Sequence, residues 1–357
     1  MTLVRYVLLL FLAIGAASQQ LPPKREHFRN ADVLYDWVTD SQGEKLRTFV
    51  TRPKNTIGKL PVIFFVGWLS RDSMEYADGE TDGFGALMLR LIDESGYATV
   101  RMNKPGVGES QGSCAKTDFD IELEGWQAAF ESMDRYDFID TRRVFVLGMS
   151  NGGGFAPLVA KGHSVRGYIA ASSWGRSWYE HMLEHERRRL TAAAKPPAEI
   201  NDRVKAFTQF YDLYLNHGMM PRQVIAQHPN WKDFWYDAPD GQYERPAAFY
   251  QQLQFLNLGQ VWQNVNAPVL VVYGTGDTVM SRADSDAISE TVNRVHPGAA
   301  QNYTVEHMNH LFEIDKKFYD PLVPEILGWI KEQLAASPHS SINLTEKDTI
   351  LSADSAH

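Results

Sequence analysis

The chain has almost no cysteine and no surplus of positive charge. Among its 357 residues, Cys114 is the only cysteine, so no disulfide can form within the chain. Clusters of cysteine and histidine with zinc-ligand spacing are also missing from the sequence. The formal net charge of −9 argues against a general nucleic-acid-binding protein, because such proteins usually carry a basic surplus. The composition therefore predicts a large globular fold that depends on its hydrophobic core.

Long hydrophobic runs are missing after the N-terminus. The first residues, MTLVRYVLLLFLAIGAASQQ, contain Arg5, one apolar run, and the small residues Ala16 and Ser18. The run is too short to span a bilayer comfortably and no stop-transfer pattern follows it, which is typical of a cleaved secretory signal. An uncleaved anchor is the alternative. We expect residues 1–18 to be a signal peptide and the protein to be secreted or periplasmic, without stable membrane insertion.

Apolar segments typical of buried strands alternate with helical patterns over most of the chain. Strand candidates include KLPVIFFVGW, RVFVLGM and APVLVVYGTGD, and helix candidates include DFDIELEGWQAAFESMDRY and DPLVPEILGWIKEQLAA. VLYDWV and KLRTFVTRP flank the turn-rich TDSQGE, which predicts a hairpin. Strands that alternate with helices imply a mostly parallel sheet with helices on both faces, which is an α/β fold.

The alternation stops between residues 175 and 266. This stretch has amphipathic helical patterns rich in aromatic residues and no candidate strand. It follows a predicted strand at the carboxyl edge of the sheet, where open α/β sheets bind their ligands. We therefore predict a core domain of residues 19–174 and 267–336, a helical lid of residues 175–266 and a disordered tail of residues 337–357.

The stretch RVFVLGMSNGGGF places Ser150 between Gly148 and Gly152, after a predicted strand and before a predicted helix. A glycine-rich loop at this place can bind phosphate or hold a nucleophile on a sharp turn. The phosphate loop needs a lysine and a hydroxyl residue after its last glycine, but Phe155 stands there. A G-x-S-x-G turn needs small residues two positions before and after its serine, and both are glycine. The stretch therefore predicts a nucleophilic serine.

A serine nucleophile needs a base to accept its proton and a carboxylate to fix the tautomer of that base. Candidates follow two late predicted strands. Asp277 ends VLVVYGTGD, and VEHMNHLF contains His307 and His310. Asp284 and Asp286 are alternative acids, but both fall near the start of a predicted helix, where a carboxylate complements the helix dipole.

This order of serine, acid and histidine resembles the α/β-hydrolase-fold serine hydrolases, from Val33 to about Ala336. The resemblance implies a mostly parallel eight-stranded sheet with Ser150 as nucleophile, Asp277 as orienting acid and His310 as base. We prefer His310 to His307 because the base of this fold commonly precedes an apolar or aromatic residue that opens a short helix. The resemblance implies neither a cofactor nor a metal.

The resemblance also implies two backbone donors for the oxyanion of a tetrahedral intermediate. One is the N–H of Asn151, directly after the serine. The other belongs to the loop VGWLSRDS, where relatives often have His-Gly and this chain has Val-Gly-Trp. We take the N–H of Trp68 as the second donor and that of Leu69 as the alternative.

We interpret two segments that contain basic residues, RMNKPGVGES and HERRRL, as structural rather than catalytic. RMNKPGVGES resembles the family segment Asp-x-x-Gly-x-Gly-x-Ser, with Asn103 and Lys104 near the usual acidic position, and its glycines predict tight turns. HERRRL in the lid could receive a carboxylate, but we interpret Arg187, Arg188 and Arg189 as a solvated helix face.

The expected function is hydrolysis of a small-molecule carboxylic ester or other acyl substrate through an acyl-enzyme. The same triad serves peptidases and thioesterases in this fold, so the substrate class rests on analogy. An aminopeptidase would need lid carboxylates for the substrate amine, and Glu180, Glu184 and Glu186 are the candidates. A non-catalytic binding module is a further alternative, against which the serine, acid and histidine in proper order argue.

Overall fold

The fold is built on a sheet of eight strands. The computed structural model describes residues 25–77 and 83–336, so the predicted signal peptide and tail lie outside the described residues. The strand order in the sheet is β1-β2-β4-β3-β5-β6-β9-β10. The bounds are β1 Ala31–Thr39, β2 Lys45–Pro53, β3 Leu60–Val66, β4 Ala98–Met102, β5 Ile139–Met149, β6 Gly167–Ala171, β9 Val269–Gly274 and β10 Ala300–Val305.

The sheet is mostly parallel, as the sequence predicts. β1 and β2 form the expected hairpin, β2 also pairs antiparallel with β4, and the strands from β4 to β10 in the sheet order are parallel. β3 is buried from Pro61 to Val66, because it lies inside a sheet that is covered on both faces. The carboxyl ends of the parallel strands meet at one edge, and the loops at this edge carry the candidate site.

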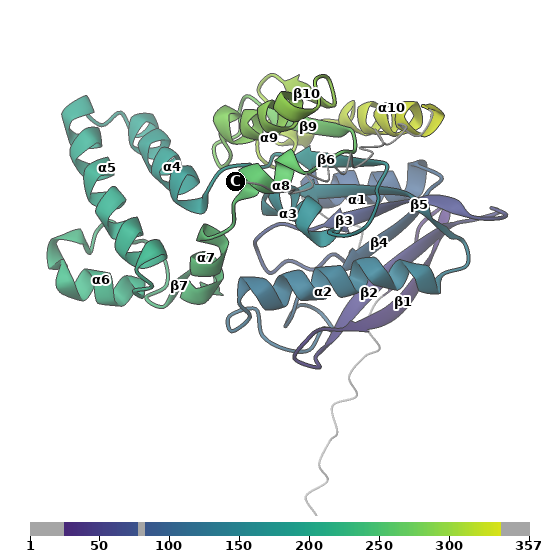
Figure 1. The fold of residues 1–357 in the computed structure, drawn as a ribbon, viewed down its shortest axis with the longest axis horizontal. Coiled ribbons are helices and arrows are strands. Elements are labelled where there is room, and N and C mark those ends of the chain that lie inside the picture. The colour runs from purple at the N-terminus through teal and green to yellow at the C-terminus, as the bar shows by residue number, and fades with distance from the viewer. Residues whose placement is uncertain (1–24, 78–82, 337–357) are drawn as a thin grey trace, which may run out of the picture.

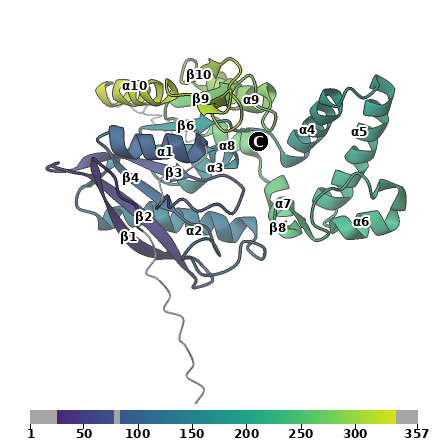
Figure 2. The same cartoon turned by 180° about the vertical axis from the view of Figure 1, so that it is seen from behind.

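Helices cover both faces of the sheet (Figures 1 and 2). On one face α1 and α10 pack together, and on the other α2, α3, α8 and α9 contact one another in turn. The bounds are α1 Gly83–Glu94, α2 Phe119–Glu131, the 3-10 turn η1 Ser132–Arg135, α3 Asn151–Val159, α8 Leu258–Gln263, α9 Arg282–Val295 and α10 Leu322–Ala335. None of the helices within residues 25–77 and 83–336 combines the length and the apolar character needed to cross a bilayer.

Residues 175–266, which we call the lid, are mostly helical. The helices α4, α5 and α6 extend from one side of the sheet, as Figure 1 shows. The elements are α4 Trp178–Ala192, α5 Pro197–Tyr211, the π-helical turn η2 Asp212–Asn216, α6 Pro221–Gln227, the 3-10 turn η3 Pro229–Trp231 and α7 Ala247–Gln254, followed by α8.

The lid also contains a strand pair that the sequence analysis did not expect. β7 (Gly241–Gln242) and β8 (Arg245–Pro246) pair antiparallel. The connecting residues Tyr243 and Glu244 have positive φ angles of 46° and 60°. Strands of two residues are too short to show an alternating pattern in a sequence, and neither turn residue is a glycine, so no ordinary turn signal marks this hairpin.

A row of aromatic rings connects the lid with the core. Ring centroids are 6.2 Å apart for Phe155 and Trp174, 5.4 Å for Trp174 and Trp178, and 5.2 Å for Trp178 and Tyr250. All four side chains are buried in the same hydrophobic cluster as the sheet. Because Trp178 and Tyr250 lie on α4 and α7, the lid packs on the core through a continuous apolar interior.

Candidate active site

Ser150 lies on a strained turn between β5 and α3. Its φ angle is 54°, which a residue with a side chain rarely adopts, and only 5% of the residue is exposed. A Cβ atom added to Gly148 would lie 2.3 Å from the carbonyl oxygen of Gly152, and one added to Gly152 would lie 2.3 Å from that of Gly67. The turn therefore leaves no room for side chains at these two glycines, which agrees with the G-x-S-x-G interpretation.

The structure brings Ser150, His310 and Asp277 together, although they are far apart in the sequence. His310 Nε2 lies 3.0 Å from Ser150 Oγ, and His310 Nδ1 lies 2.9 Å from Asp277 Oδ2. Asp277 follows β9 and His310 follows β10, which places both at the carboxyl edge of the sheet. The backbone N–H groups of Val279 and Met280 both donate to Asp277 Oδ1 at 2.8 Å. The carboxylate is thus held in one orientation toward the imidazole.

His307, the alternative base, lies outside this arrangement. It is exposed with a φ angle of 62°, and its backbone N–H donates to Thr275 Oγ1 at 2.8 Å. The prediction of a short helix directly after His310 is wrong. The chain turns instead into the hairpin of β11 (Glu313–Ile314) and β12 (Lys317–Phe318).

The side chain of Asn309 explains the absence of that helix. Its Oδ1 accepts hydrogen bonds from the N–H groups of Leu311 and Glu313, both at 2.9 Å. Such local side-chain bonds satisfy the backbone without a helix. Phe312 then takes a positive φ angle of 62°, and its ring packs in a T-shape on Phe84.

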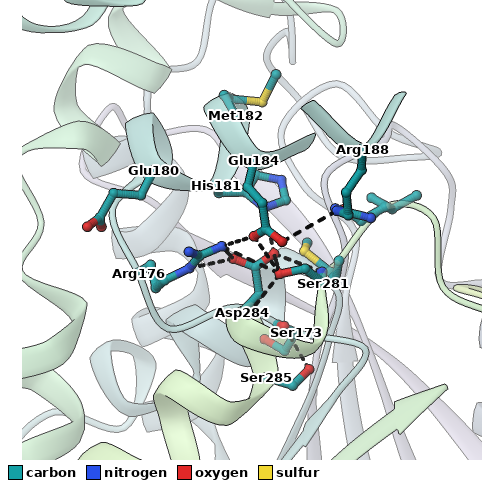
Figure 3. Close-up of polar contacts among 12 residues, drawn as sticks. Ser173, Arg176, Glu180, His181, Met182, Glu184, Arg188, Ser281, Asp284 and Ser285 are labelled. Carbon is teal, nitrogen blue, oxygen red and sulfur yellow. Dashed lines mark hydrogen bonds and ion pairs between the residues drawn. The ribbon is translucent and has the colours of Figure 1, made fainter. Parts of the chain in front are cut away.

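The alternative acids serve α9 rather than the serine. Asp284 is fully buried and caps α9 together with Ser281, which is the structural interpretation offered above. Figure 3 shows it between α4 and α9, where it also binds Arg176 and His181 at 2.7 and 3.1 Å. Although burial acts in the opposite direction, His181 and Arg176 hold the pKa of Asp284 well below its usual range.

The predicted oxyanion donors are backbone amides of the serine turn and of the loop that carries Trp68. Neither the N–H of Asn151 nor that of Trp68 donates a hydrogen bond to another residue in the described part of the chain. The loop of Trp68 lies beside the serine turn, because Gly152 packs against the carbonyls of Val66 and Gly67. The Trp68 ring itself is buried against Phe84, and its Nε1 donates to Asp72 at 2.8 Å.

Two buried cations hold the carbonyl groups of this loop. Lys104 Nζ donates to the carbonyl oxygen of Trp68 at 2.6 Å and also to that of Ser70. Arg245 of β8 donates to the carbonyl oxygen of Leu69 at 3.2 Å. Burial lowers the pKa of Lys104 to about 8. The sequence analysis treated Lys104 as structural and did not single out Arg245, because no short motif relates either residue to the distant loop.

The three lid carboxylates considered for a substrate amine are all engaged within the protein. Glu180 caps α4 by accepting from the N–H of Ser177, and Glu184 binds Arg176 and Ser281 (Figure 3). Glu186 is fully buried, and burial raises its pKa, although Arg189 Nε donates to it at 2.9 Å. Glu180 is the exposed member of this set, and its capping contacts are with Ser177.

The described residues offer no metal site: none of their histidine, cysteine, aspartate and glutamate side chains form a group of three or more placed to hold an ion. The polar groups around Ser150 form a relay of serine, imidazole and carboxylate. The backbone N–H groups of Asn151 and Trp68 belong to the serine turn and to the loop beside it. This arrangement can transfer a proton from a hydroxyl group and stabilise a nearby negative charge.

Solved structures with the same fold include two esterases. An esterase of Pyrococcus furiosus shares 14% identity with a TM-score of 0.53, over 85% of this chain and 91% of its own. Est1E of Butyrivibrio proteoclasticus, solved with ferulic acid bound, shares 18% identity with a TM-score of 0.57, over 84% of this chain and 100% of its own. At such low identity the likeness shows the fold alone.

Sequence comparisons identify the family. No curated protein matches the chain significantly. The family model of the X-Pro dipeptidyl-peptidases (S15 family) matches residues 42–291, which is more than half of the chain and includes Ser150 and Asp277. The chain therefore belongs to the S15 family, as a serine hydrolase with the α/β-hydrolase fold.

Proposed function

We propose that the protein hydrolyses carboxylic esters through an acyl-enzyme formed on Ser150. The observation that carries this proposal is the unbroken relay from Ser150 Oγ through His310 to Asp277, with distances of 3.0 and 2.9 Å. Relays of this kind activate a serine for attack on an acyl carbon. A binding module that has no catalytic role would not need this geometry.

The mechanism follows from the positions of these groups. Ser150 Oγ attacks the ester carbonyl carbon while His310 Nε2 accepts its proton, and Asp277 stabilises the imidazolium through Nδ1–H. The N–H groups of Asn151 and Trp68 donate to the oxyanion of the tetrahedral intermediate. His310 then returns the proton to the leaving alcohol. Water, activated by the same imidazole, hydrolyses the acyl-enzyme and restores Ser150.

Dipeptidyl-peptidase activity is the second candidate, because the family model carries that name. A peptidase that acts at an N-terminus must bind the substrate amine, and the three lid carboxylates considered for this role already have partners within the protein. This observation favours an acyl substrate without a charged amine. Hydrolysis of acyl thioesters would use the same groups.

The substrate classes can be compared on the purified protein. We expect release of p-nitrophenol from acetyl and butyryl esters to exceed release of p-nitroaniline from an X-Pro anilide, with an acyl thioester as a third substrate. Ser150→Ala and His310→Ala should lose about 10³-fold or more of the ester activity. His307→Ala is the matched control and should stay within a few-fold of the wild type.

Two results would overturn the proposal in different ways. Faster cleavage of the X-Pro anilide than of the esters would assign the protein to peptidases. A wild type that cleaves none of the substrates, and whose Ser150 is not labelled by a fluorophosphonate, would contradict catalysis altogether.

We further propose that the N-terminal segment directs export to a secreted or periplasmic location. The support is the apolar run after Arg5, which ends in small residues. Mass spectrometry of the protein from the extracellular or periplasmic fraction should find Gln19 as the first residue. A chain that retains Met1, or that stays inside the cell, would contradict this proposal.

A further inference from the structure

Arg188 on α4 binds the loop that carries Asp277. Its Nη1 donates to the carbonyl oxygen of Thr278 at 3.0 Å, and its Nη2 donates to that of Val279 at 2.8 Å. The solvated helix face predicted for this segment is therefore wrong at Arg188, whose guanidinium group spans two consecutive carbonyl groups. The side chain of its neighbour Arg187 donates to Asn201 of the lid instead.

The two carbonyl groups belong to the same peptide units that orient Asp277. The unit between residues 278 and 279 contains the Thr278 carbonyl and the Val279 N–H. The next unit contains the Val279 carbonyl and the Met280 N–H. Both of these N–H groups donate to Asp277 Oδ1 at 2.8 Å. In a planar trans peptide the carbonyl and the following N–H point in opposite directions. Arg188 and Asp277 therefore hold the same two peptide planes from opposite sides.

The helix that carries Arg188 is itself fixed to the start of α9. Glu184, one turn before Arg188, accepts from Ser281 Oγ at 2.7 Å and lies 3.7 Å from Arg188 Nε. Arg176 binds Glu184 and, at 2.7 Å, the buried Asp284 (Figure 3). The guanidinium group of Arg188 thus lies beside a polar network that joins α4 to the start of α9, and its planar fork loses less entropy per hydrogen bond than a flexible ammonium group would.

We propose that Arg188 is a positioning residue for the triad: by fixing the two peptide units after Asp277, it keeps the carboxylate directed at His310. This inference rests on the proposed function, because it assigns Asp277 to the triad. It gives the lid a role in the chemistry. Without the guanidinium group, the two peptide planes can rotate, and the carboxylate loses the donors that fix it.

The test compares Arg188→Met with Arg188→Lys and Arg187→Met. Methionine keeps an unbranched apolar stem and removes the charge. Lysine keeps the charge but lacks the planar fork that matches two consecutive carbonyl groups, and Arg187→Met removes an arginine one position away on the same helix. The readouts are kcat and KM for p-nitrophenyl butyrate, the rate of fluorophosphonate labelling of Ser150, and Tm.

Arg188→Met should lower kcat and the labelling rate by about 10- to 100-fold, because small misplacements of catalytic groups have effects of this size. KM should change by less than about 3-fold, because ground-state binding of the ester does not depend on Asp277. Arg188→Lys should recover part of the loss, and Arg187→Met should stay within about 2-fold of the wild type.

The inference is overturned if Arg188→Met lowers Tm but keeps kcat, if it raises KM alone, or if Arg187→Met loses as much activity. If Arg188→Met does not fold, Arg188→Lys decides, since full activity in that variant contradicts the need for the guanidinium fork. The rate of fluorophosphonate labelling separates failure of the role proposed for Arg188 from failure of the proposed function. An unlabelled wild type contradicts both proposals, whereas a wild type and Arg188→Met that are labelled equally fast contradict the role of Arg188 alone.

Discussion

At the scale of single residues, the position of Ser150 depends on what its neighbours lack. Its strained φ angle costs about 1–3 kcal/mol and persists only where the surroundings enforce it. The N–H of Ser150 donates to the carbonyl of Ala171 at 2.9 Å, and the N–H of Gly153 donates to the carbonyl of Ser150 at 3.1 Å. The missing side chains of Gly148 and Gly152 let the turn, α3 and the Trp68 loop approach one another.

Replacing Gly152 by alanine should disrupt this approach. The added methyl group would lie 2.3 Å from the Gly67 oxygen and 2.4 Å from the Val66 oxygen, so the serine turn and the Trp68 loop must move apart. We expect Gly152→Ala to lower Tm and to reduce kcat by about 10²-fold or more, as small displacements of a catalytic group do. Thermal melts and ester kinetics check both effects.

Gly328→Ala is the matched control. Gly328 lies in α10, and a Cβ added there meets no atom within 4 Å. Alanine should therefore raise the stability by about 0.5–1 kcal/mol and leave kcat unchanged, since glycine loses more backbone freedom in a helix. If Gly152→Ala and Gly328→Ala have the same Tm and the same kcat, a methyl group fits at Gly152 and the expected close contact is wrong.

At the scale of elements, α4 contacts the loop that carries Asp277 and also contains His185. His185 Nδ1 is buried and has no hydrogen-bond partner among the residues that the structure describes. Burial lowers the pKa of His185 to about 4, and the nearby His181, Arg188 and Arg189 add to this effect while Asp284 opposes it. The folded helix therefore holds this imidazole neutral.

The stability of the protein should therefore fall as the pH decreases from 6.5 to 4. In this window the unfolded chain, with an ordinary histidine pKa of 6.5, binds a proton that the folded chain does not. The contribution of His185 is present above pH 6.5 and is lost toward pH 4, with a size of about 3 kcal/mol. His185→Gln should flatten this part of the pH dependence, as measured by urea unfolding at pH 7 and pH 4.5.

The wild type, unfolded in urea at the same two pH values, provides the comparison. If His185→Gln and the wild type lose the same free energy of unfolding between the two pH values, the histidine does not titrate as described. The effect belongs to α4 because the charges that lower the pKa lie on that helix.

At the scale of the whole molecule, one buried ion pair fastens the start of the described chain to the sheet. Arg101 of β4 binds both carboxylate oxygens of Glu26 at 2.7 Å and also donates to the Met74 carbonyl at 2.6 Å. The same carboxylate accepts from the Tyr76 N–H at 2.8 Å. The side chains of Glu26 and Arg101 are only 1% and 0% exposed. Glu26, which precedes β1 in the chain, thus pairs with a residue of β4 inside the sheet.

Glu26→Ala should lower the free energy of unfolding by about 3–5 kcal/mol, because it leaves a buried guanidinium group without its counter-charge. Arg222→Ala, which removes a pair between exposed side chains with Asp240, should cost less than about 1 kcal/mol. Urea unfolding of the two variants gives the comparison. If Glu26→Ala and Arg222→Ala unfold at similar urea concentrations, the carboxylate of Glu26 is solvated in the folded protein.

The fold and the serine turn could be predicted because local sequence determines them. Continuous apolar runs specify buried strands, and the glycines around Ser150 specify a turn that only small residues permit. The short pair β7–β8 and the turn after His310 could not be predicted, because Asn309 and two residues with positive φ angles determine them rather than any periodic pattern.

The sequence by itself determined the strands of the large sheet, the helical character of most of residues 175–266 and the candidates for serine, acid and base. Only the tertiary structure shows that the ring of His310, and not that of His307, contacts Ser150 and Asp277, since both histidines follow β10 in the sequence. It also decided that Lys104, Arg188 and Arg245 bind carbonyl groups of the catalytic loops. These contacts join segments far apart in the chain, and a long cationic side chain shows its carbonyl partner only after the chain has folded.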